Sequence, residues 1–492
     1  MSSGQPMVPL SSDGSSRSTP RGLHLALLLT LVAITLVVYL PAIRGGFVWD
    51  DDDYVLNNTA LRTPAGLWTI WFETDPAKRF YPLSQYYAMV YTVFWLEYHL
   101  WGTDPLGYHG VNVLLHALNA VLLALILRRL AVPGGWLAAA VFALHPVHVE
   151  SVAWITELKN VLSGAFFLGA LLAYLRFEPM APVASPAGRN RRFYGLAIAL
   201  FACALVSKSV TCSLPAVILL VLWWKRDKIR WGDVLPLIPF FAVGLVLGLL
   251  TVWMEKQYVG ASGPEWDLTF TQRLLIASRA LWFYAGKLVW PTNLTFIYPR
   301  WEIDASHGFN YLFVVLTLAA VIGLWLLRRR LGKGPLVAVL FFAGVLFPAL
   351  GFVNIYPMRY SFVADHFQYL ASIGLIVVIV AATAKLIARA SPRAAYGAAA
   401  ASCALVVLGS LTWRQGYVYT DLETLWRDTL RKNPDAWIAH NNYGNLLTRR
   451  GQYKEALEHL NETLRIKPGY PQGYNNRANA YIGLGEIGRA HV

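Results

Sequence analysis

Long apolar runs recur along almost the whole chain, and they constrain its fold more than any other feature. About eleven of them are long enough, or nearly so, to cross the hydrocarbon core of a bilayer as α-helices. They fall near residues 23–43, 108–127, 134–149, 160–175, 193–207, 210–224, 234–253, 310–327, 335–353, 369–388 and 395–413. With 56% hydrophobic and only 14% charged residues, the composition is typical of a polytopic membrane protein and not of a soluble enzyme. The sequence therefore predicts an all-α membrane bundle.

Five basic clusters occur at every second boundary between these runs. They are Arg128–Arg129, Arg189–Arg192, Lys225–Arg230, Arg328–Lys333 and Lys385–Arg393. Cytoplasmic loops of membrane proteins carry an excess of Lys and Arg, so we expect all five clusters and the N-terminus in the cytoplasm. The net charge of +14 then reflects membrane orientation, and we expect no nucleic-acid partner.

This alternation is consistent only if two semi-apolar stretches, 80–101 and 272–290, do not cross the membrane. We expect both to be interfacial helices that lie on the outer surface. The remaining boundaries are acidic or aromatic, and all of them face outward in this scheme. The candidate chemistry therefore gathers on the extracytoplasmic side.

Four consecutive aspartates stand in the first of these outer loops, in the stretch "GFVWDDDDYVLNN" from Gly45 to Asn57. Neighbouring carboxylates repel one another, so each ionises less readily than it would alone. Such a loop is either a solvated cap on a helix or a place where carboxylates have a chemical task. The stretch by itself leaves both interpretations open.

Polar side chains also follow one face of the second apolar run, in "YHGVNVLLHALN". His109, Asn112, His116 and Asn119 recur there at helical spacing. Polar groups in membrane helices commonly form hydrogen bonds to neighbouring helices. We favour that interpretation for these four residues, which we call the polar ladder. His109, which is nearest the outer end, is the candidate for lining a site.

The stretch "HPVHVESVAWITELKN" collects further titratable groups at the outer end of the third run. These are His145, His148, Glu150, Glu157 and Lys159, and all of them except Glu157 are candidate site residues. The H-x-x-H-x-E spacing suits metal ligands only if a third, spatially fixed ligand joins it. Structural and functional roles are about equally expected here.

Cations near the later outer boundaries are candidates for binding a phosphate. Lys208, in "SKSVTCSLP", stands at the tip of a tight hairpin, where a snorkelling lysine is the alternative. Arg279 and Lys287 alternate with aromatic residues, as they would on a helix at the lipid headgroups. The stretch "RYSFVADHFQYLASIGL" adds Arg359, Asp365 and His366 at the outer start of another run.

The C-terminal segment contains a helical repeat. Residues 437–470 read as one 34-residue tetratricopeptide repeat (TPR), with Gly444, Gly451, Tyr453, Ala456 and Pro468 at the expected positions. A degenerate repeat precedes it and another unit begins after it. About three stacked units are needed for a continuous core, so we expect a truncated array. Concave arrays of this kind usually bind peptides or proteins; a structural cap is the alternative.

These features divide the chain into three parts. Residues 1–22, rich in Ser and Pro, are expected to be a disordered cytoplasmic tail. Residues 23–413 form the membrane domain, and residues 414–492 form the TPR segment outside the cytoplasm.

Six motifs, in this order, carry a resemblance to a known family. The aspartate stretch, the Tyr108–His116 ladder, "HPVHVESVAWITELKNVLSG", "SKSVTCSLP", "YPRW" and "ADHFQYLASIGL" resemble the motifs of bacterial relatives of the TMTC-type proteins. Those are transmembrane, TPR-containing O-mannosyltransferases of the GT-C glycosyltransferase class. The resemblance implies a GT-C-like bundle with outer interfacial helices, and it places Asp50 and Asp51 on the paired aspartates of the family.

The function expected from this resemblance is transfer of a sugar, mannose or a similar hexose, from a polyprenyl-phosphate donor to Ser or Thr of a protein. Asp50 or Asp51 would be the catalytic base, and Lys208, Arg279 and Lys287 would hold the leaving phosphate. A divalent metal, Mg²⁺ or Mn²⁺, could bridge Asp50, Asp51 and the phosphate. Acceptor proteins or peptides would bind through the TPR segment.

The expected location is the bacterial inner membrane. Two other functions remain open at this point. A flippase for lipid-linked sugars would use a similar cationic groove without a base, and an inert membrane anchor could carry the TPR as a scaffold.

Overall fold

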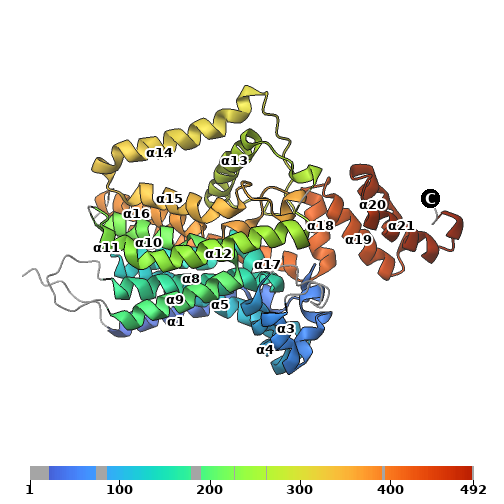
Figure 1. Cartoon of the computed structure of the whole chain (residues 1–492), viewed down its shortest axis with the longest axis horizontal. Coiled ribbons are helices and arrows are strands. Elements are labelled where there is room, and N and C mark those ends of the chain that lie inside the picture. The colour runs from blue at the N-terminus through green and yellow to red at the C-terminus, as the bar shows by residue number, and fades with distance from the viewer. Residues whose placement is uncertain are drawn as a thin grey trace, which may run out of the picture.

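The computed structural model describes residues 21–73, 86–178, 190–226, 228–261, 263–390 and 394–489. All regular elements within these ranges are helical (Figure 1), which confirms the predicted all-α class. The predicted tail falls almost entirely outside the described residues, as do residues 80–85 of the first predicted interfacial stretch.

Every one of the predicted apolar runs contains a helix. The helices of the membrane domain are α1 (Arg21–Val38), α2 (Leu40–Ile43), α3 (Pro64–Phe72), α4 (Ala88–Trp101), α5 (Pro105–Arg129), α6 (Gly135–Leu144), α7 (Val149–Ala153), α8 (Leu158–Phe177), α9 (Arg191–Ser207), α10 (Leu214–Lys225), α11 (Trp231–Val234), α12 (Ile238–Met254), α13 (Phe270–Val289), α14 (Leu312–Leu331), α15 (Gly334–Leu346), α16 (Ser372–Ala390) and α17 (Ala394–Gly416). The C-terminal segment follows with α18 (Leu422–Lys432), α19 (Trp437–Arg449), α20 (Tyr453–Ile466) and α21 (Pro471–Gly483).

Length and composition identify the helices of the described ranges that can cross a membrane. Five pass by themselves: Pro105–Arg129, Ile155–Phe177, Trp231–Val259, Gly308–Leu331 and Ala395–Tyr419. Gly135–Leu144 and Pro146–Ala153 pass the test together and meet at a bend of 54°, because a proline inside a helix removes a backbone donor. The pair is either a broken sixth span or a re-entrant loop. Four shorter apolar helices coincide with four more predicted runs: Gly22–Val38, Ser209–Lys225, Gly334–Ala349 and Ser372–Ile387. The remaining predicted run forms α9. Within the described ranges, neither α4 nor α13 passes this test for a span, and their interfacial position stays a prediction.

The polar ladder of α5 lies in the centre of the bundle and joins helices to one another. Asn112 Nδ2 donates to the Trp154 carbonyl over 3.2 Å, and Asn119 Nδ2 donates to the Val161 carbonyl over 2.9 Å. The His116 ring lies between the Tyr369 hydroxyl (2.8 Å) and the Ala143 carbonyl (3.1 Å). These are the interhelical bonds that the spacing predicts.

The described residues of the basic clusters gather at one end of the bundle, whereas residues 189, 227 and 391–393 of these clusters lie outside the described ranges. Arg129 Nε donates to the Leu175 carbonyl over 2.9 Å, and Lys333 Nζ donates to the Arg226 carbonyl over 2.8 Å. Figure 1 shows α11 and the carboxyl end of α14 at this end, whereas α18–α21 lie at the opposite end. The alternation of charge along the sequence therefore becomes a separation of charge along the long axis of the molecule.

The helices α19 and α20 are the predicted repeat. A Cβ at Gly444 would lie 2.7 Å from Leu460 Cγ, so the close packing of these two helices requires a residue without a side chain at this position. α18 and α21 flank this pair as the predicted neighbouring units.

The TPR segment packs tightly on the membrane domain. The ring of Trp426, on α18, lies 5.1 Å from that of Trp49 and 5.8 Å from that of Phe296. Lys432 Nζ donates to the Leu294 carbonyl over 2.6 Å, and the rings of Trp437 and Tyr360 are 5.4 Å apart. These contacts join the two parts into one hydrophobic core.

We therefore expect Trp426→Ala to destabilise the whole protein, by about 3–5 kcal/mol for a buried tryptophan. Thermal unfolding of the detergent-solubilised protein measures the effect. The control is Trp68→Ala, because the Trp68 side chain is 69% exposed. Equal melting temperatures for the two variants would contradict the shared core.

Candidate active site

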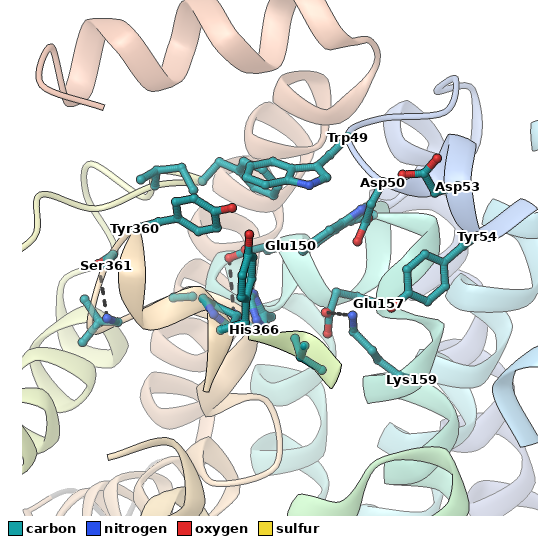
Figure 2. Close-up of a pocket in the computed structure, with 18 of the residues that line it drawn as sticks. Trp49, Asp50, Asp53, Tyr54, Glu150, Glu157, Lys159, Tyr360, Ser361 and His366 are labelled. Atoms are coloured by element: carbon teal, nitrogen blue, oxygen red, sulfur yellow. Dashed lines mark hydrogen bonds and ion pairs between the residues drawn. The ribbon is translucent and has the colours of Figure 1, made fainter. Parts of the chain in front are cut away.

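A cavity of about 390 Å³ opens at the end of the bundle that carries the TPR segment. Three stretches far apart in the sequence enclose it, around residues 49–54, 150–159 and 356–366 (Figure 2). Its charged and titratable lining comprises Asp50, Asp53, Tyr54, Glu150, Glu157, Lys159, Tyr258, Tyr356, Tyr360 and His366.

The aspartate loop enters the cavity through a backbone conformation that is rare for residues other than glycine. Trp49 has φ = 51°, which lies in the left-handed region and costs free energy for a bulky residue. Its ring is surrounded by the rings of Trp154, Phe296 and Tyr360, at 6.4, 5.0 and 5.9 Å. This packing holds the loop and fixes the direction of the next residue, Asp50.

Asp51 fastens the loop to the rest of the site. It is fully buried, and its Oδ1 accepts hydrogen bonds from the Thr156 backbone N–H (2.8 Å) and hydroxyl (2.6 Å). Its Oδ2 accepts from the Val48 N–H over 2.8 Å. Both oxygens are therefore engaged in structure.

Asp50 is held differently. Within the described residues its Oδ1 is buried without a hydrogen-bond partner, and its side chain points into the cavity toward Glu157 and Lys159 (Figure 2). Asp50 thus lines the cavity and, unlike Asp51, has an oxygen that is not used to hold the loop. Of the two aspartates that the resemblance leaves open, the geometry therefore favours Asp50 as the base.

Burial controls the protonation of both groups. Desolvation raises the pKa of Asp50 to about 6, while the charge of Lys159 acts in the opposite direction. Desolvation and the charge of Asp50 raise the pKa of Asp51 to about 8, against the three hydrogen bonds it accepts. Two buried carboxylates side by side favour a single negative charge between them.

Lys159 supplies positive charge to the cavity. Its Nζ lies 3.0 Å from Glu157 Oε1 and 5.5 Å from the centre of the Tyr54 ring. Lys208, another predicted phosphate-binding residue, contacts the same carboxylate over 3.3 Å and donates to Asn160 Oδ1 over 2.7 Å. Lys208 therefore lies behind Glu157 and does not line the cavity.

His366 and Glu150 form a pair on the opposite wall. His366 Nδ1 lies 2.8 Å from Glu150 Oε1, and the His366 backbone N–H donates to Oε2 over 3.3 Å. The carboxylate thus orients the imidazole toward the cavity. Both residues are among the sequence-predicted candidates.

The three other predicted histidines lie outside the cavity lining. His109 Nε2 is 3.3 Å from the Gly46 carbonyl, and His145 Nε2 is 3.0 Å from the Leu288 carbonyl. His148 contacts the Phe142 carbonyl (2.8 Å) and the Ser372 hydroxyl (2.9 Å). In the structure these imidazoles tie loops and helices together behind the site.

The predicted cations of the later loops are also engaged outside the cavity lining. Arg279 lies 4.4 Å from the centre of the Trp301 ring, and Lys287 Nζ donates to the Thr292 carbonyl over 2.7 Å. Arg359 donates to the hydroxyl of Tyr356, a residue of the cavity lining, over 2.7 Å. Asp365 accepts a hydrogen bond from the Tyr298 hydroxyl over 3.1 Å. Arg279 and Lys287 are not among the residues that line the cavity, and their contact with a phosphate stays a prediction.

The aromatic lining and Glu157 are the parts of the site that the predicted set lacks. Trp49, Trp154, Phe296 and Tyr360 form apolar walls. Trp49 directly precedes the four aspartates, and Glu157 stands two residues before Lys159. Both could therefore have been predicted as site residues from their closeness in sequence to predicted ones. Phe296 and Tyr360 reach the cavity only through the tertiary fold.

A metal ion bridged by Asp50 and Asp51 stays a prediction. No group of three or more His, Cys, Asp or Glu side chains within the described ranges is arranged to hold an ion. Both oxygens of Asp51 accept backbone hydrogen bonds, whereas Oδ1 of Asp50 accepts none from the described residues.

Comparisons with known proteins agree with the sequence motifs. Human protein O-mannosyl-transferase TMTC1 is 26% identical over 91% of this chain and 56% of its own length. The Caenorhabditis elegans protein O-mannosyl-transferase F38B6.6 is 24% identical over 94% of this chain and 65% of its own. A family model described as a TPR repeat matches residues 444–485. The predicted resemblance is confirmed, and the chain spans between about half and two thirds of the length of these relatives.

Two solved membrane-protein structures are similar at a lower level. ArnT from Cupriavidus metallidurans, bound to undecaprenyl phosphate, has a TM-score of 0.41 at 19% identity, covering 94% of this chain and 78% of that chain. The Archaeoglobus fulgidus oligosaccharyltransferase has a TM-score of 0.43 at 12% identity, covering 86% and 60%. Likeness at this level assigns no ligand or activity to this chain.

The contrast between the two aspartates leads to a stability prediction. Asp51→Ala removes three hydrogen bonds and leaves buried N–H groups unsatisfied, so we expect a loss of about 1–3 kcal/mol or more. Asp50→Asn should leave stability unchanged or raise it. Since the pKa of Asp50 is raised in the folded state, its favourable contribution is lost as pH rises through about 6.

Melting temperatures of the purified variants, measured well above and well below pH 6, check this difference. Any gain from Asp50→Asn should be larger at the higher pH. A destabilisation by Asp50→Asn equal to that by Asp51→Ala would show that both aspartates are structural.

Proposed function

We propose that this integral membrane protein is a GT-C-type glycosyltransferase that transfers a sugar, mannose or a similar hexose, from a polyprenyl-phosphate donor to Ser or Thr hydroxyls of a protein. The observation that carries the proposal is the Asp50 carboxylate, whose Oδ1 has no hydrogen-bond partner among the described residues and which shares one cavity with Lys159 and His366. The names of the relatives support the same activity.

Asp50 is the base of the proposed reaction. As the acceptor oxygen attacks the anomeric carbon, its proton passes to Asp50 and the bond from that carbon to the phosphate oxygen breaks. The products are an inverted glycoside and a polyprenyl phosphate. A pKa of about 6 keeps most of the base ionised at neutral pH while leaving it more basic than an exposed aspartate.

Lys159 stabilises the leaving phosphate in this mechanism, and His366 lines the same cavity. Negative charge builds on the phosphate as the sugar leaves, and a cation placed in advance lowers the barrier. Glu157 and Glu150 hold these two side chains in position over 3.0 and 2.8 Å. The aromatic walls exclude water and offer flat apolar faces to a sugar ring.

The proposed orientation follows from the separation of charge in the fold. The basic end would face the cytoplasm of a bacterial inner membrane, so the cavity and the TPR segment would lie outside. Acceptor proteins or peptides would then approach the cavity along the TPR segment, which packs against its rim.

Asp50→Asn should abolish transfer while the protein remains folded and inserted. A positioned general base contributes about 10²–10⁴-fold in rate. The assay uses purified protein, a polyprenyl-phosphate sugar and a Ser/Thr peptide, with Asp52→Asn, on the same loop but outside the cavity lining, as the matched control. Near-normal turnover by Asp50→Asn would show that Asp50 is not the catalytic base. It would favour a function that needs no base, such as lipid flipping.

The pH dependence of kcat/KM offers a second measurement. Because the base must be ionised, we expect kcat/KM to rise with pH through about 6 and then level off. Lys159→Met should move this inflection to higher pH, since the lysine charge lowers the pKa of Asp50. A flat profile, or an inflection that shifts downward in the variant, would contradict the assignment of Asp50.

The orientation has its own test. A cysteine introduced at Gly451, on the turn between α19 and α20, should react with a membrane-impermeant reagent when only the outer face of the inner membrane is accessible. If this cysteine reacts only after the inner membrane is opened, the TPR segment lies in the cytoplasm and the proposed orientation is wrong.

A further inference from the structure

Lys208 contacts the charged wall of the cavity from behind. It stands in the turn after α9, where its backbone N–H donates to the Ala204 carbonyl over 2.9 Å. Its Nζ donates to Asn160 Oδ1 over 2.7 Å and lies 3.3 Å from Glu157 Oε2. Only 12% of its side chain is exposed. Lys208 therefore touches a residue of the cavity lining, Glu157, without lining the cavity itself.

Glu157 lies between two ammonium groups. Its Oε1 is 3.0 Å from Lys159 Nζ, on the side of the cavity (Figure 2), and its Oε2 is 3.3 Å from Lys208 Nζ, on the side away from it. The carboxylate side chain is only 1% exposed. Two cations that share one carboxylate leave a formal charge of +1 on the group of three, whereas a simple pair would be neutral.

The other charges of the cavity make this difference important for an anionic ligand. Asp50, Asp53, Glu150 and Glu157 line the cavity, and Lys159 is the one Lys or Arg side chain among its described lining residues. If Lys159 were paired with Glu157 alone, this wall would offer a phosphate no net attraction. Charges act strongly over several ångströms in a region of low dielectric constant, so a cation just behind the wall changes the potential in the cavity.

Asn160 holds Lys208 in place without neutralising it. The amide Oδ1 accepts from Lys208 Nζ, while Nδ2 donates to the His366 carbonyl over 3.0 Å and to the Ser151 hydroxyl over 3.2 Å. An amide carries no charge. Glu157 is therefore the one carboxylate within ion-pair distance of Lys208 among the described residues, and Asn160 fixes the ammonium relative to two walls of the cavity.

We propose that Lys208 is a positioning residue for phosphate binding. It neutralises Glu157 from behind the wall and so leaves the charge of Lys159 available to the phosphate of a polyprenyl donor. This inference rests on the proposed function for the identity of the ligand. It gives Lys208 an action through Glu157 in place of the direct phosphate contact that the sequence predicts.

The test measures phosphate binding without sugar or acceptor. The probe is farnesyl phosphate, a short polyprenyl phosphate, titrated calorimetrically into the detergent-solubilised full chain. Lys208→Met removes the charge at nearly the same length, and we expect binding about 10- to 100-fold weaker than that of the unmodified protein. Lys208→Arg keeps the charge and should restore binding.

Two controls separate the charge effect from loss of folding and from binding of the lipid chain. Lys225→Met removes a lysine at the opposite, basic end of the bundle, where its Nζ donates to the Leu130 carbonyl, and this variant should bind farnesyl phosphate normally. Farnesol has the same chain without the phosphate and should bind equally to Lys208→Met and to the unmodified protein. Inorganic phosphate should bind more weakly than farnesyl phosphate, with the same fold loss in Lys208→Met.

The double variant Glu157→Gln/Lys208→Met gives the sharpest measurement. Glutamine is neutral, so Lys159 again has an uncompensated charge and the affinity for farnesyl phosphate should recover most of what Lys208→Met lost. Such non-additivity is expected for residues in contact. If Lys208 bound the phosphate directly, or served only to hold the fold, removing Glu157 as well would bring no recovery.

Several outcomes would overturn the inference: normal binding by Lys208→Met, weak binding by Lys208→Arg, no recovery in the double variant, or no binding by the unmodified protein. The transfer assay keeps the two proposals apart. If binding behaves as expected but Asp50→Asn retains full turnover, the proposed base fails and the role of Lys208 stands. If Asp50→Asn is inactive but Lys208→Met binds normally, the proposed function stands and the role of Lys208 fails.

Discussion

The carboxylate of Asp51 is the interaction on which the site depends. Its three hydrogen bonds, to Val48 and to the backbone and hydroxyl of Thr156, fix the aspartate loop against the segment that carries Glu157 and Lys159. Loss of such an acceptor would leave buried donors unsatisfied. This attachment places Asp50, which has an unoccupied oxygen, opposite Lys159. Neighbouring aspartates of one sequence motif thus have separate tasks, one structural and one proposed to be chemical.

The same loop connects the cavity to the TPR segment. Trp49, in a left-handed conformation, is held by aromatic rings from several parts of the chain, including Trp426 of α18. Packing of large aromatic groups offsets the cost of the strained backbone. A disturbance of α18 therefore reaches the residue next to Asp50 through direct contact, so α18 supports the cavity wall from behind.

The cavity balances its buried charges in pairs. Glu157 lies between two lysines, and Glu150 contacts His366. Removing one member of such a pair leaves an uncompensated charge in a region of low dielectric constant. Asp50 alone of the carboxylates named here combines a cavity position with a buried, unbonded oxygen and no direct ion pair, and desolvation accordingly raises its pKa. A group held in this way is less stable as an ion and more useful as a base.

The sequence by itself determined the helical class, the runs that form the bundle, the separation of basic loops from the acidic end and the position of the repeat at 437–470. These follow from local patterns, because hydrophobic length, charge bias and repeat period are properties of contiguous residues. It also selected Asp50, Glu150, Lys159 and His366, which lie on one cavity. Only the tertiary structure showed that the other candidates do not line this cavity: His109, His145, His148, Lys208, Arg279 and Lys287. The sequence could not show this, because the same residue types also form contacts between helices. It also distinguished Asp50 from Asp51, because which carboxylate meets Thr156 depends on a segment about a hundred residues away, brought into contact by the folding of the whole bundle.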